Sequence, residues 1–404
     1  MTFNELGLTK PLLMALNDMG YQNPTSIQQQ AIPHILKGND VFGCAQTGTG
    51  KTAAFALPIL HQLASVQNEK KHIKALIIAP TRELVSQIGE SIKQYSKHLS
   101  IASANIFGGV SQHHQQKEIE RGVDILVATP GRLMDLMQQK LVKLDHLEYF
   151  VLDEADRMLD MGFINDIKRI ISRLPAKRQT LFFSATIAPN IMALAQTLLK
   201  NPVKVSTTPV SSTNVLVEQS LYYVAKEDKK RLLTYLLNDD KIGHVLVFTR
   251  TKRGADNVAK DLNKSGISSE AIHGNKSQGA REKSLARFKD RKIRVLVATD
   301  IASRGIDVDR LSHVINYEIP EQAETYVHRI GRTGRAGLTG KALSFCTNEE
   351  VSYMKDIYKL IKREIDIVAV HPFSKPSSPV QIKKINFKQK SKTIKHEKRN
   401  SKIF

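Results

Sequence analysis

Several residue types are scarce in this sequence, and each shortage argues against a class of protein. The 404 residues include two cysteines, no tryptophan and only 6% aromatic residues. Cys44 and Cys346 lie far apart, each in an apolar run without neighbouring histidines, so we expect buried free thiols in a reducing cytoplasm, not a disulfide framework or zinc site. No apolar run is long enough to cross a bilayer and no signal segment opens the sequence, so we expect a cytoplasmic protein without a membrane partner.

Acidic residues are also in short supply. The 60 lysines and arginines outnumber the 39 acidic residues, which gives a formal net charge of +21. Residues 371–404 contain nine lysines and Arg399 against Glu397 alone, so they carry +9 and leave +12 on residues 1–370. The basic excess therefore belongs to the folded part as well as to the tail. It predicts a polyanionic partner, for which nucleic acid is the natural candidate, although charge alone leaves an acidic protein or a membrane surface open.

A glycine-rich turn follows the apolar run at residues 41–44 and has the features of a phosphate-binding loop. Gly48 and Gly50 allow a tight turn with inward N–H groups, and Lys51 supplies a cation. A helix expected to start near Thr52 adds its positive end to the same site. Ala45 replaces the first glycine of the strict pattern, so the turn alone could be an ordinary loop. The expected phosphate-binding residues are Thr47, Gly48, Thr49, Gly50, Lys51 and Thr52, with the Thr52 hydroxyl also offered to Mg²⁺.

A run of acidic residues, Asp153-Glu-Ala-Asp156, follows a second apolar run at residues 149–152. Alone, such a run is usually a solvated helix start. Placed at the carboxyl end of a parallel strand, it lies where open α/β sheets bind ligands. Asp153 is then expected to hold the metal, and Glu154 to orient or deprotonate a water. Together with the glycine-rich turn, the acidic run predicts a site that hydrolyses a nucleoside triphosphate.

The rest of the chain alternates short apolar runs with longer amphipathic segments, which is the pattern of parallel α/β folds. The predicted domains are residues 1–207, a linker at 208–217, residues 218–370 and a disordered basic tail at 371–404. Predicted strands cover residues 41–44, 75–79, 125–128, 150–152 and 180–183 in the first half, and 244–248, 269–272, 295–298, 313–317 and 342–345 in the second.

Polar residues cluster where these strands end. Residues 80–83, 129–132 and 184–186 follow strands of the first half, and pairs such as Thr249-Arg250 and His273-Gly274 follow strands of the second. The carboxyl ends of parallel strands meet at one edge of a sheet, so each half has one polar edge. We expect the two edges to face each other across the linker and form a cleft.

About ten motifs in a fixed order resemble those of the DEAD-box RNA helicases, over roughly residues 1–370. The resemblance implies two tandem RecA-like domains and an RNA-stimulated ATPase that uses ATP and Mg²⁺ to unwind short duplexes or remodel RNA–protein complexes. Residues 272–281 and the short basic tail are most similar to the bacterial RhlE-like subgroup. The matching segments are residues 20–28, 45–52, 80–83, 108–109, 129–132, 153–156, 184–186, 247–250, 298–307 and 328–335.

The resemblance also implies a role for individual residues around the nucleotide. The amide of Gln28 both donates and accepts hydrogen bonds, as adenine recognition requires, and Phe3 is either its aromatic packing partner or a core anchor. Asp307 is expected at the ribose. Arg332 and Arg335 are three positions apart, predicted on one side of a helical turn, and are expected to act as arginine fingers. The residues expected to couple the nucleotide to interdomain closure are Asp156, Ser184, Thr186 and His328.

The expected RNA contacts are charges, hydroxyls and bare backbone amides without an aromatic stacking platform. Such contacts suit phosphate and sugar, so the sequence predicts binding without sequence preference, with RNA selected through its 2′-OH and duplex shape. A DNA-translocating helicase and a non-hydrolysing RNA clamp are the rival functions. RhlE-like relatives imply ribosomal precursors or RNA-degradation machinery as partners. The expected RNA-binding residues are Arg82, Gly109, Thr129, Arg132, Thr249, Arg250, Gly274 and Thr299.

Overall fold

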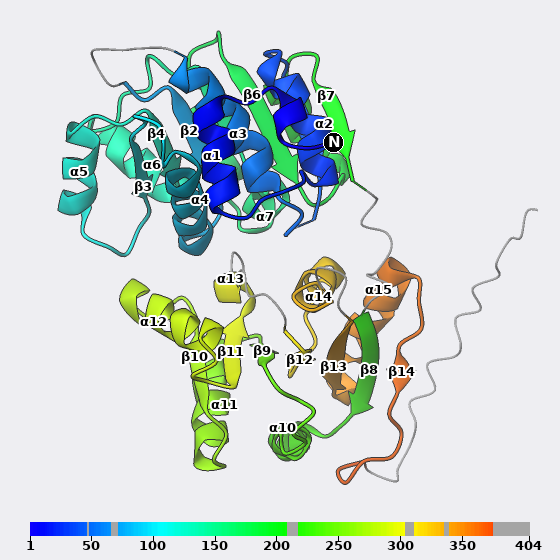
Figure 1. Cartoon of the computed structure of the whole chain (residues 1–404). Helices are drawn as coiled ribbons and strands as arrows, with labels where there is room; N and C mark the ends of the chain where they lie inside the picture. The colour runs from blue at the N-terminus through cyan, green and yellow to red at the C-terminus, as the bar shows by residue number, and fades with distance from the viewer. Residues whose placement is uncertain (47, 66–71, 208–216, 304–310, 335–338, 375–404) are drawn as a thin grey trace, which may run out of the picture.

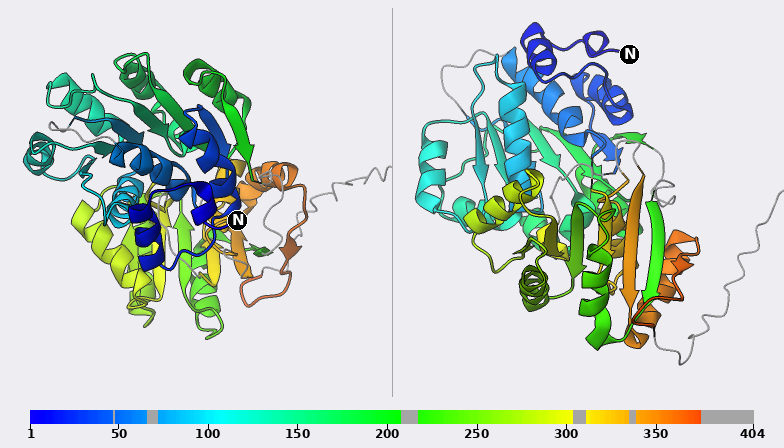
Figure 2. Two further views of the ribbon diagram at one scale, coloured as in Figure 1. Left: turned by 45° about the horizontal axis from the view of Figure 1, so that its top comes forward. Right: turned by 60° about the horizontal axis from the view of Figure 1, so that its bottom comes forward.

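Two parallel β-sheets, each with helices on both faces, form the core of two domains. The computed structural model describes residues 1–46, 48–65, 72–207, 217–303, 311–334 and 339–374. Figure 1 shows the first domain above the second, and the views in Figure 2 show the helices that cover the sheets. Within the described residues each sheet has seven strands, and every strand pair is parallel. This architecture confirms the predicted pair of RecA-like domains.

The first domain has the strand order β3-β4-β2-β5-β6-β1-β7. The strands β1 and β5, which precede the two predicted phosphate and metal motifs, are separated only by β6, so both motifs reach the same sheet edge. The elements are a short 3₁₀ turn (Asn4–Leu6), α1 (Lys10–Asp18), α2 (Ser26–Leu36), β1 (Val41–Cys44), α3 (Lys51–Ala64), β2 (Ala75–Ile78), α4 (Arg82–Tyr95), β3 (Ser103–Ile106), α5 (Gln112–Glu120), β4 (Ile125–Ala128), α6 (Pro130–Gln138), β5 (Tyr149–Leu152), α7 (Ala155–Asp160), α8 (Ile164–Ile171), β6 (Gln179–Ser184), α9 (Pro189–Leu198) and β7 (Val203–Ser206).

The second domain has the order β10-β11-β9-β12-β13-β8-β14. Its helices α12, α13 and α14 lie on the side that faces the first domain (Figure 1). The elements are β8 (Val217–Tyr223), a 3₁₀ turn (Lys226–Asp228), α10 (Lys229–Leu237), β9 (Val245–Thr249), α11 (Lys252–Lys264), β10 (Ser269–Ile272), α12 (Gln278–Lys289), β11 (Val295–Thr299), α13 (Asp300–Ser303), β12 (His313–Asn316), α14 (Ala323–Ile330), β13 (Gly340–Cys346), a 3₁₀ turn (Asn348–Glu350), α15 (Val351–Ile361) and β14 (Asp366–Ile367).

Alternate residues of the central strands enter opposite layers of the core. In the first sheet, Val151 packs with α3 and α4 on one face, whereas Phe150 and Leu152 pack with α6, α8 and α9 on the other. This division follows from the two-residue period of a strand, and it explains why strands covered on both faces are apolar throughout. Both cysteines are buried and free, as predicted. None of the described helices is long and apolar enough to cross a membrane.

The structure differs from the predicted domain limits at two places. Val217, which the prediction included in the linker, is the first residue of β8. At the other end, the first residues of the predicted tail pack on the second domain. The His371 ring lies 5.7 Å from the Tyr222 ring, and Phe373 lies 6.2 Å from Tyr235. Residues 208–216 and 375–404 lie outside the described residues.

Candidate active site

The glycine-rich turn joins β1 to α3, and its main chain is fixed by local hydrogen bonds. The Ala45 N–H donates to the Ser184 carbonyl at 3.0 Å, and the Lys51 ammonium donates to the Ala45 carbonyl at 2.8 Å. Gly50 caps α3 with φ 92°, a left-handed conformation that disfavours other residues. The helix N-terminus and Lys51 are thereby directed to one place, as anion binding requires. Thr47 of the predicted set lies outside the described residues.

Gln28 links α2 to this turn. Its side-chain oxygen accepts from the Thr25 N–H at 2.9 Å, and its amide nitrogen donates to the Gly50 carbonyl at 3.1 Å. A Cβ atom at position 50 would lie 2.3 Å from that amide nitrogen, so this approach also requires glycine. Phe3, the expected adenine neighbour, is 4% exposed within the hydrophobic core, and its ring stacks 6.4 Å from Tyr21. Gln28 is therefore adjacent to the phosphate loop, while Phe3 anchors the N-terminal segment.

The acidic run lies between β5 and α7 in a strained turn. Glu154 has φ 53° and ψ 48°, a left-handed conformation that is uncommon for residues other than glycine. Its N–H donates to an Asp153 carboxylate oxygen at 2.9 Å. Burial, together with the neighbouring Glu154 and Asp156 carboxylates, raises the pKa of Asp153 to about 6, while Lys51 acts in the opposite direction.

A divalent cation fits this donor set. Burial and the neighbouring Glu154 and Asp156 carboxylates disfavour the charge on Asp153, and a bound cation would favour it. No group of three or more His, Cys, Asp or Glu side chains among the described residues is arranged to hold a metal by itself. Mg²⁺ is commonly held by one or two protein oxygens together with phosphate oxygens and water, so it fits a site offering Asp153 and the Thr52 hydroxyl.

The expected coupling residues of the first domain make hydrogen bonds within one small region around residues 184–186. The Asp156 carboxylate accepts from the Arg157 N–H and the Ala185 N–H, both at 3.1 Å. The hydroxyl of Ser184 accepts from the Thr186 N–H at 3.2 Å. The acidic motif and residues 184–186 are thus joined directly.

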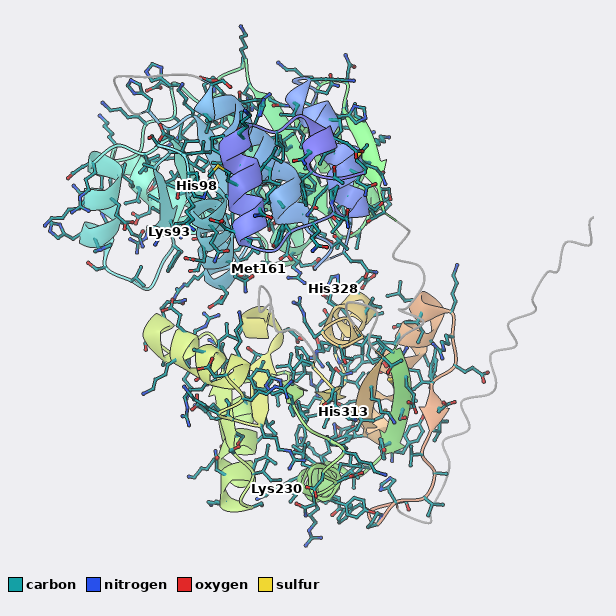
Figure 3. The ribbon with its side chains drawn as sticks, viewed as in Figure 1. Lys93, His98, Met161, Lys230, His313 and His328 are labelled. Atoms are coloured by element: carbon teal, nitrogen blue, oxygen red, sulfur yellow. The ribbon has the colours of Figure 1, made fainter. Side chains whose placement is uncertain are left out.

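The second domain presents α14 and the turn after it. α14 ends at Ile330, and Gly331 caps it, so Arg332 lies in a tight turn after the helix. The prediction that Arg332 and Arg335 share a helical turn is wrong for Arg332, because the helix stops two residues earlier. Arg332 and His328 line a small gap that also contains Arg157 of the first domain. Figure 3 shows His328 at the boundary, opposite Met161 of the first domain. Arg335 and Asp307 lie outside the described residues.

A cavity of about 460 Å³ opens between the domains on the side of α4 and α12. It brings together four of the expected RNA-binding residues: Arg82, Thr129, Arg132 and Gly274. Gly109 lies beside it, since a Cβ atom there would be 2.0 Å from the Arg82 guanidinium. Its φ of 80° also requires glycine.

The structure places the other three expected RNA-binding residues differently. Thr249 is fully buried, and its hydroxyl donates to the Thr251 carbonyl at 3.2 Å. Thr299 is buried at the end of β11. The Arg250 guanidinium lies 3.4 Å from the Glu350 carboxylate and 3.7 Å from that of Glu321. None of these three residues lines the described cavity.

An ion pair that the motifs did not predict crosses the domain boundary. The Arg281 guanidinium on α12 lies 2.7 Å from the Glu83 carboxylate on α4, and both side chains are at least nine-tenths buried. Burial raises the pKa of Glu83, and the Arg281 charge only partly opposes this. Arg157 was also missed, although it follows the acidic run directly and pairs with Glu154 at 2.7 Å. The i, i+3 spacing of Glu154 and Arg157 is a signal that could have found their pair, whereas nothing local indicates the contact between Glu83 and Arg281.

Taken together, the phosphate loop, the buried acidic motif and the arginine-bearing turn on a second RecA-like domain define an ATP-hydrolysing helicase of two domains. The comparisons give the family. Residues 25–194 match the DEAD/DEAH box helicase family, and residues 228–337 match the helicase conserved C-terminal domain. This chain therefore belongs to the DEAD-box ATP-dependent RNA helicases.

Individual relatives are similar over most of this chain. The DEAD-box ATP-dependent RNA helicase CshA of Bacillus cereus is 43% identical over 90% of this chain and 69% of its own length. RNA helicase CrhR of Synechocystis is 42% identical, over 91% and 74%. The structure of Saccharomyces cerevisiae Dbp5 bound to RNA and ADP BeF3 is 32% identical and covers 91% of this chain and 95% of its own, with a TM-score of 0.82.

Proposed function

We propose that ATP is hydrolysed between the two domains of this helicase, with the nucleotide held by the first and the reaction completed by the second. The observation that carries this proposal is the placement of Arg332 and His328 beside Arg157, one turn of α7 from Glu154. Gln28 recognises adenine, and the phosphates lie against the glycine-rich turn. Thr47, Thr49 and Asp307 keep the nucleotide roles that the family resemblance implies, whereas Phe3 is assigned to the core.

In the hydrolysis step a water attacks the γ-phosphorus, and the bond from this phosphorus to the oxygen bridging to the β-phosphate breaks, so that ADP leaves. Glu154 orients the water and accepts the proton that it loses. Arg332, with Arg335 on sequence grounds, stabilises the charge on the transferred group, a contribution of about 10³–10⁵ in rate in comparable enzymes. Mg²⁺, held by Asp153 and Thr52, would supply positive charge at the phosphate oxygens.

RNA is proposed to lie along the boundary and to contact both domains. The cavity beside Arg82, Thr129, Arg132 and Gly274 offers guanidinium groups, a hydroxyl and bare backbone. These groups contact phosphate and sugar, so binding should not depend on sequence. Thr249 and Thr299 are buried and would need to turn outward to contribute, whereas Arg250 is exposed and would need to exchange its carboxylate partners for phosphate.

Two further proposals concern the subgroup of helicases to which this chain belongs and the cellular setting in which it acts. Residues 272–281 and the basic tail support an RhlE-like helicase, whereas the relatives described above carry the names CshA and CrhR. A cytoplasmic role on ribosomal precursors, or with the RNA-degradation machinery, follows from the same resemblance. Crosslinking in cells followed by sequencing of the bound RNA tests this setting directly.

The proposal for the site is tested by interdomain fluorescence energy transfer combined with ATPase assays. Transfer should rise only when AMP-PNP and RNA are both present, and the ATPase rate should rise with RNA but not with DNA of the same sequence. Equal stimulation by DNA supports the DNA-helicase alternative. RNA binding without turnover supports the clamp.

A further inference from the structure

Arg157 is an almost fully buried charge whose purpose the family motifs leave unassigned. It lies on α7, three residues after Glu154, and its guanidinium is 2.7 Å from the Glu154 carboxylate. The Arg157 side chain is 4% exposed and that of Glu154 is 2% exposed. Glu154 has a left-handed backbone at the N-cap of α7, so its ion pair with Arg157 spans the first turn of this helix.

A small gap beside Arg157 is lined mainly by the other domain. The gap beside it is also lined by Phe248, Asp300, Thr325, His328, Arg329 and Arg332, all of the second domain. Its volume is about 10 Å³, which leaves room for one water at most. The dry environment of the ion pair therefore depends on the second domain being in place.

The charges on this surface do not compete strongly for Arg157. Asp300 carries the nearby carboxylate, and it already accepts hydrogen bonds from two Arg329 nitrogens, at 2.6 and 2.8 Å. Where the second domain meets Arg157, its Asp300 carboxylate is thus already paired with Arg329, and Arg332 is adjacent. Under these conditions Arg157 retains Glu154 as its acidic partner.

We propose that Arg157 is a positioning residue that links domain closure to the placement of Glu154. When the domains separate, water reaches the guanidinium, and an ion pair in water restricts its partners only weakly. When the second domain covers Arg157, the same ion pair becomes dry and fixes one orientation of the Glu154 carboxylate. Domain closure thereby orients the Glu154 carboxylate, in addition to bringing the arginine fingers into the site. This inference rests on the proposed role of Glu154 in hydrolysis.

The test compares Arg157→Met and Arg157→Lys with Arg178→Met in the full-length chain. Arg178 is a matched control because it is a partly buried arginine of the first domain, whose guanidinium lies 5.9 Å from the Phe150 ring, away from the site. We expect Arg157→Met to lower the RNA-stimulated kcat about 30-fold, with the KM for ATP within threefold of wild type. The ratio of RNA-stimulated to RNA-free rate should fall about tenfold. Arg157→Lys should lower kcat at least threefold, because a flexible lysine ammonium cannot reproduce the fixed direction in which the planar guanidinium donates to Glu154.

Energy transfer on closure with AMP-PNP and RNA should match wild type in both variants. If Arg157→Met does not fold, the Arg157→Lys result decides the question. A wild-type kcat in a folded variant, a loss expressed mainly in KM, or failure to close overturns the inference. Glu154→Gln is measured in parallel: if it still hydrolyses ATP, the proposed role of Glu154 fails. If only the Arg157 variants behave as wild type, the Arg157 inference alone fails.

Discussion

Arg281 of the second domain and Glu83 of the first lie 2.7 Å apart, and both side chains are at least nine-tenths buried beside the cavity between the domains. Removing one partner of a buried ion pair leaves an uncompensated charge and costs about 3–5 kcal/mol when the pair cannot open. At a domain boundary, separation of the domains relieves part of this cost. The ion pair should therefore affect closure more than folding.

The first prediction is that Glu83→Gln raises the RNA concentration for half-maximal ATPase about tenfold while nucleotide binding to the first domain is unchanged. The measurement is steady-state ATPase against RNA concentration, with Glu90→Gln, an exposed position on the same helix, as control. A double-mutant cycle with Arg281→Gln should give a coupling free energy of about 0.5–3 kcal/mol in closure. Additive effects of the two substitutions would show that the ion pair is not coupled to closure.

The second prediction separates binding from hydrolysis at Glu154. Glu154→Gln keeps the shape of the side chain but cannot accept a proton, so turnover should fall about 10²–10⁴-fold while ATP and RNA affinities stay near wild type. Fluorescent-nucleotide binding and steady-state ATPase are measured on the same preparation. Glu148→Gln, which lies just before β5 and is half exposed, is the control. Loss of nucleotide affinity with turnover retained would contradict the assignment.

The third prediction concerns stability, because the pKa of Asp153 is raised to about 6 from its ordinary value of 3.8. A carboxyl with a raised folded-state pKa binds protons more tightly in the folded protein. The free energy of unfolding therefore falls as pH rises from about 4 to about 6 and then levels off. Without Mg²⁺ and nucleotide, Asp153→Asn should melt several degrees higher than wild type at pH 7.5, with the difference lost near pH 4.

Thermal unfolding followed across this pH range tests the Asp153 prediction. The exposed Asp145→Asn should melt as wild type at every pH, which controls for the general loss of a carboxylate. Mg²⁺ with ATP should reverse the order at pH 7.5, since wild-type Asp153 then has a cation to pair with. An Asp153→Asn protein that is less stable than wild type at pH 7.5 in the absence of ligand would refute the burial argument.

How much of the fold was predictable from sequence depended on how many faces of each strand are covered. β1 and β4 have the predicted bounds, because strands inside a parallel sheet are apolar or small throughout, and β10 also has them although it is an edge strand that contains Glu270. β3, β7 and β14 lie at sheet edges and were missed. β8 was also missed, although it is internal, because three consecutive polar residues, Glu218, Gln219 and Ser220, interrupt its apolar run.

The site was predictable where function is encoded in contiguous motifs, as in the phosphate loop and the acidic run. It was not predictable where two distant segments meet. Glu83 and Arg281 are on different domains, and their contact follows from domain packing, to which neither local sequence is a guide. The end of α14 at Ile330 was similarly hidden, since Gly331 stops a helix whose spacing suggested continuation through Arg332.

The last prediction concerns the basic C-terminal segment. His371 and Phe373 pack on the second domain, so a truncation that tests the segment should follow Ser374 and leave these contacts intact. Residues 375–404 carry nine lysines and Arg399 against Glu397, a charge of +9 with few apolar groups. The functional interpretation is an electrostatic tether that raises RNA affinity without sequence preference, and the alternative is a solvated extension without function.

Each phosphate neutralised contributes about 0.7 to the log–log dependence of single-strand affinity on salt, so truncation should weaken RNA binding most at low salt and flatten this slope. The RNA-free ATPase rate should not change, because every proposed catalytic residue lies upstream, and it serves as the internal control. If RNA affinity and its salt slope are both the same after truncation, the segment is not a tether.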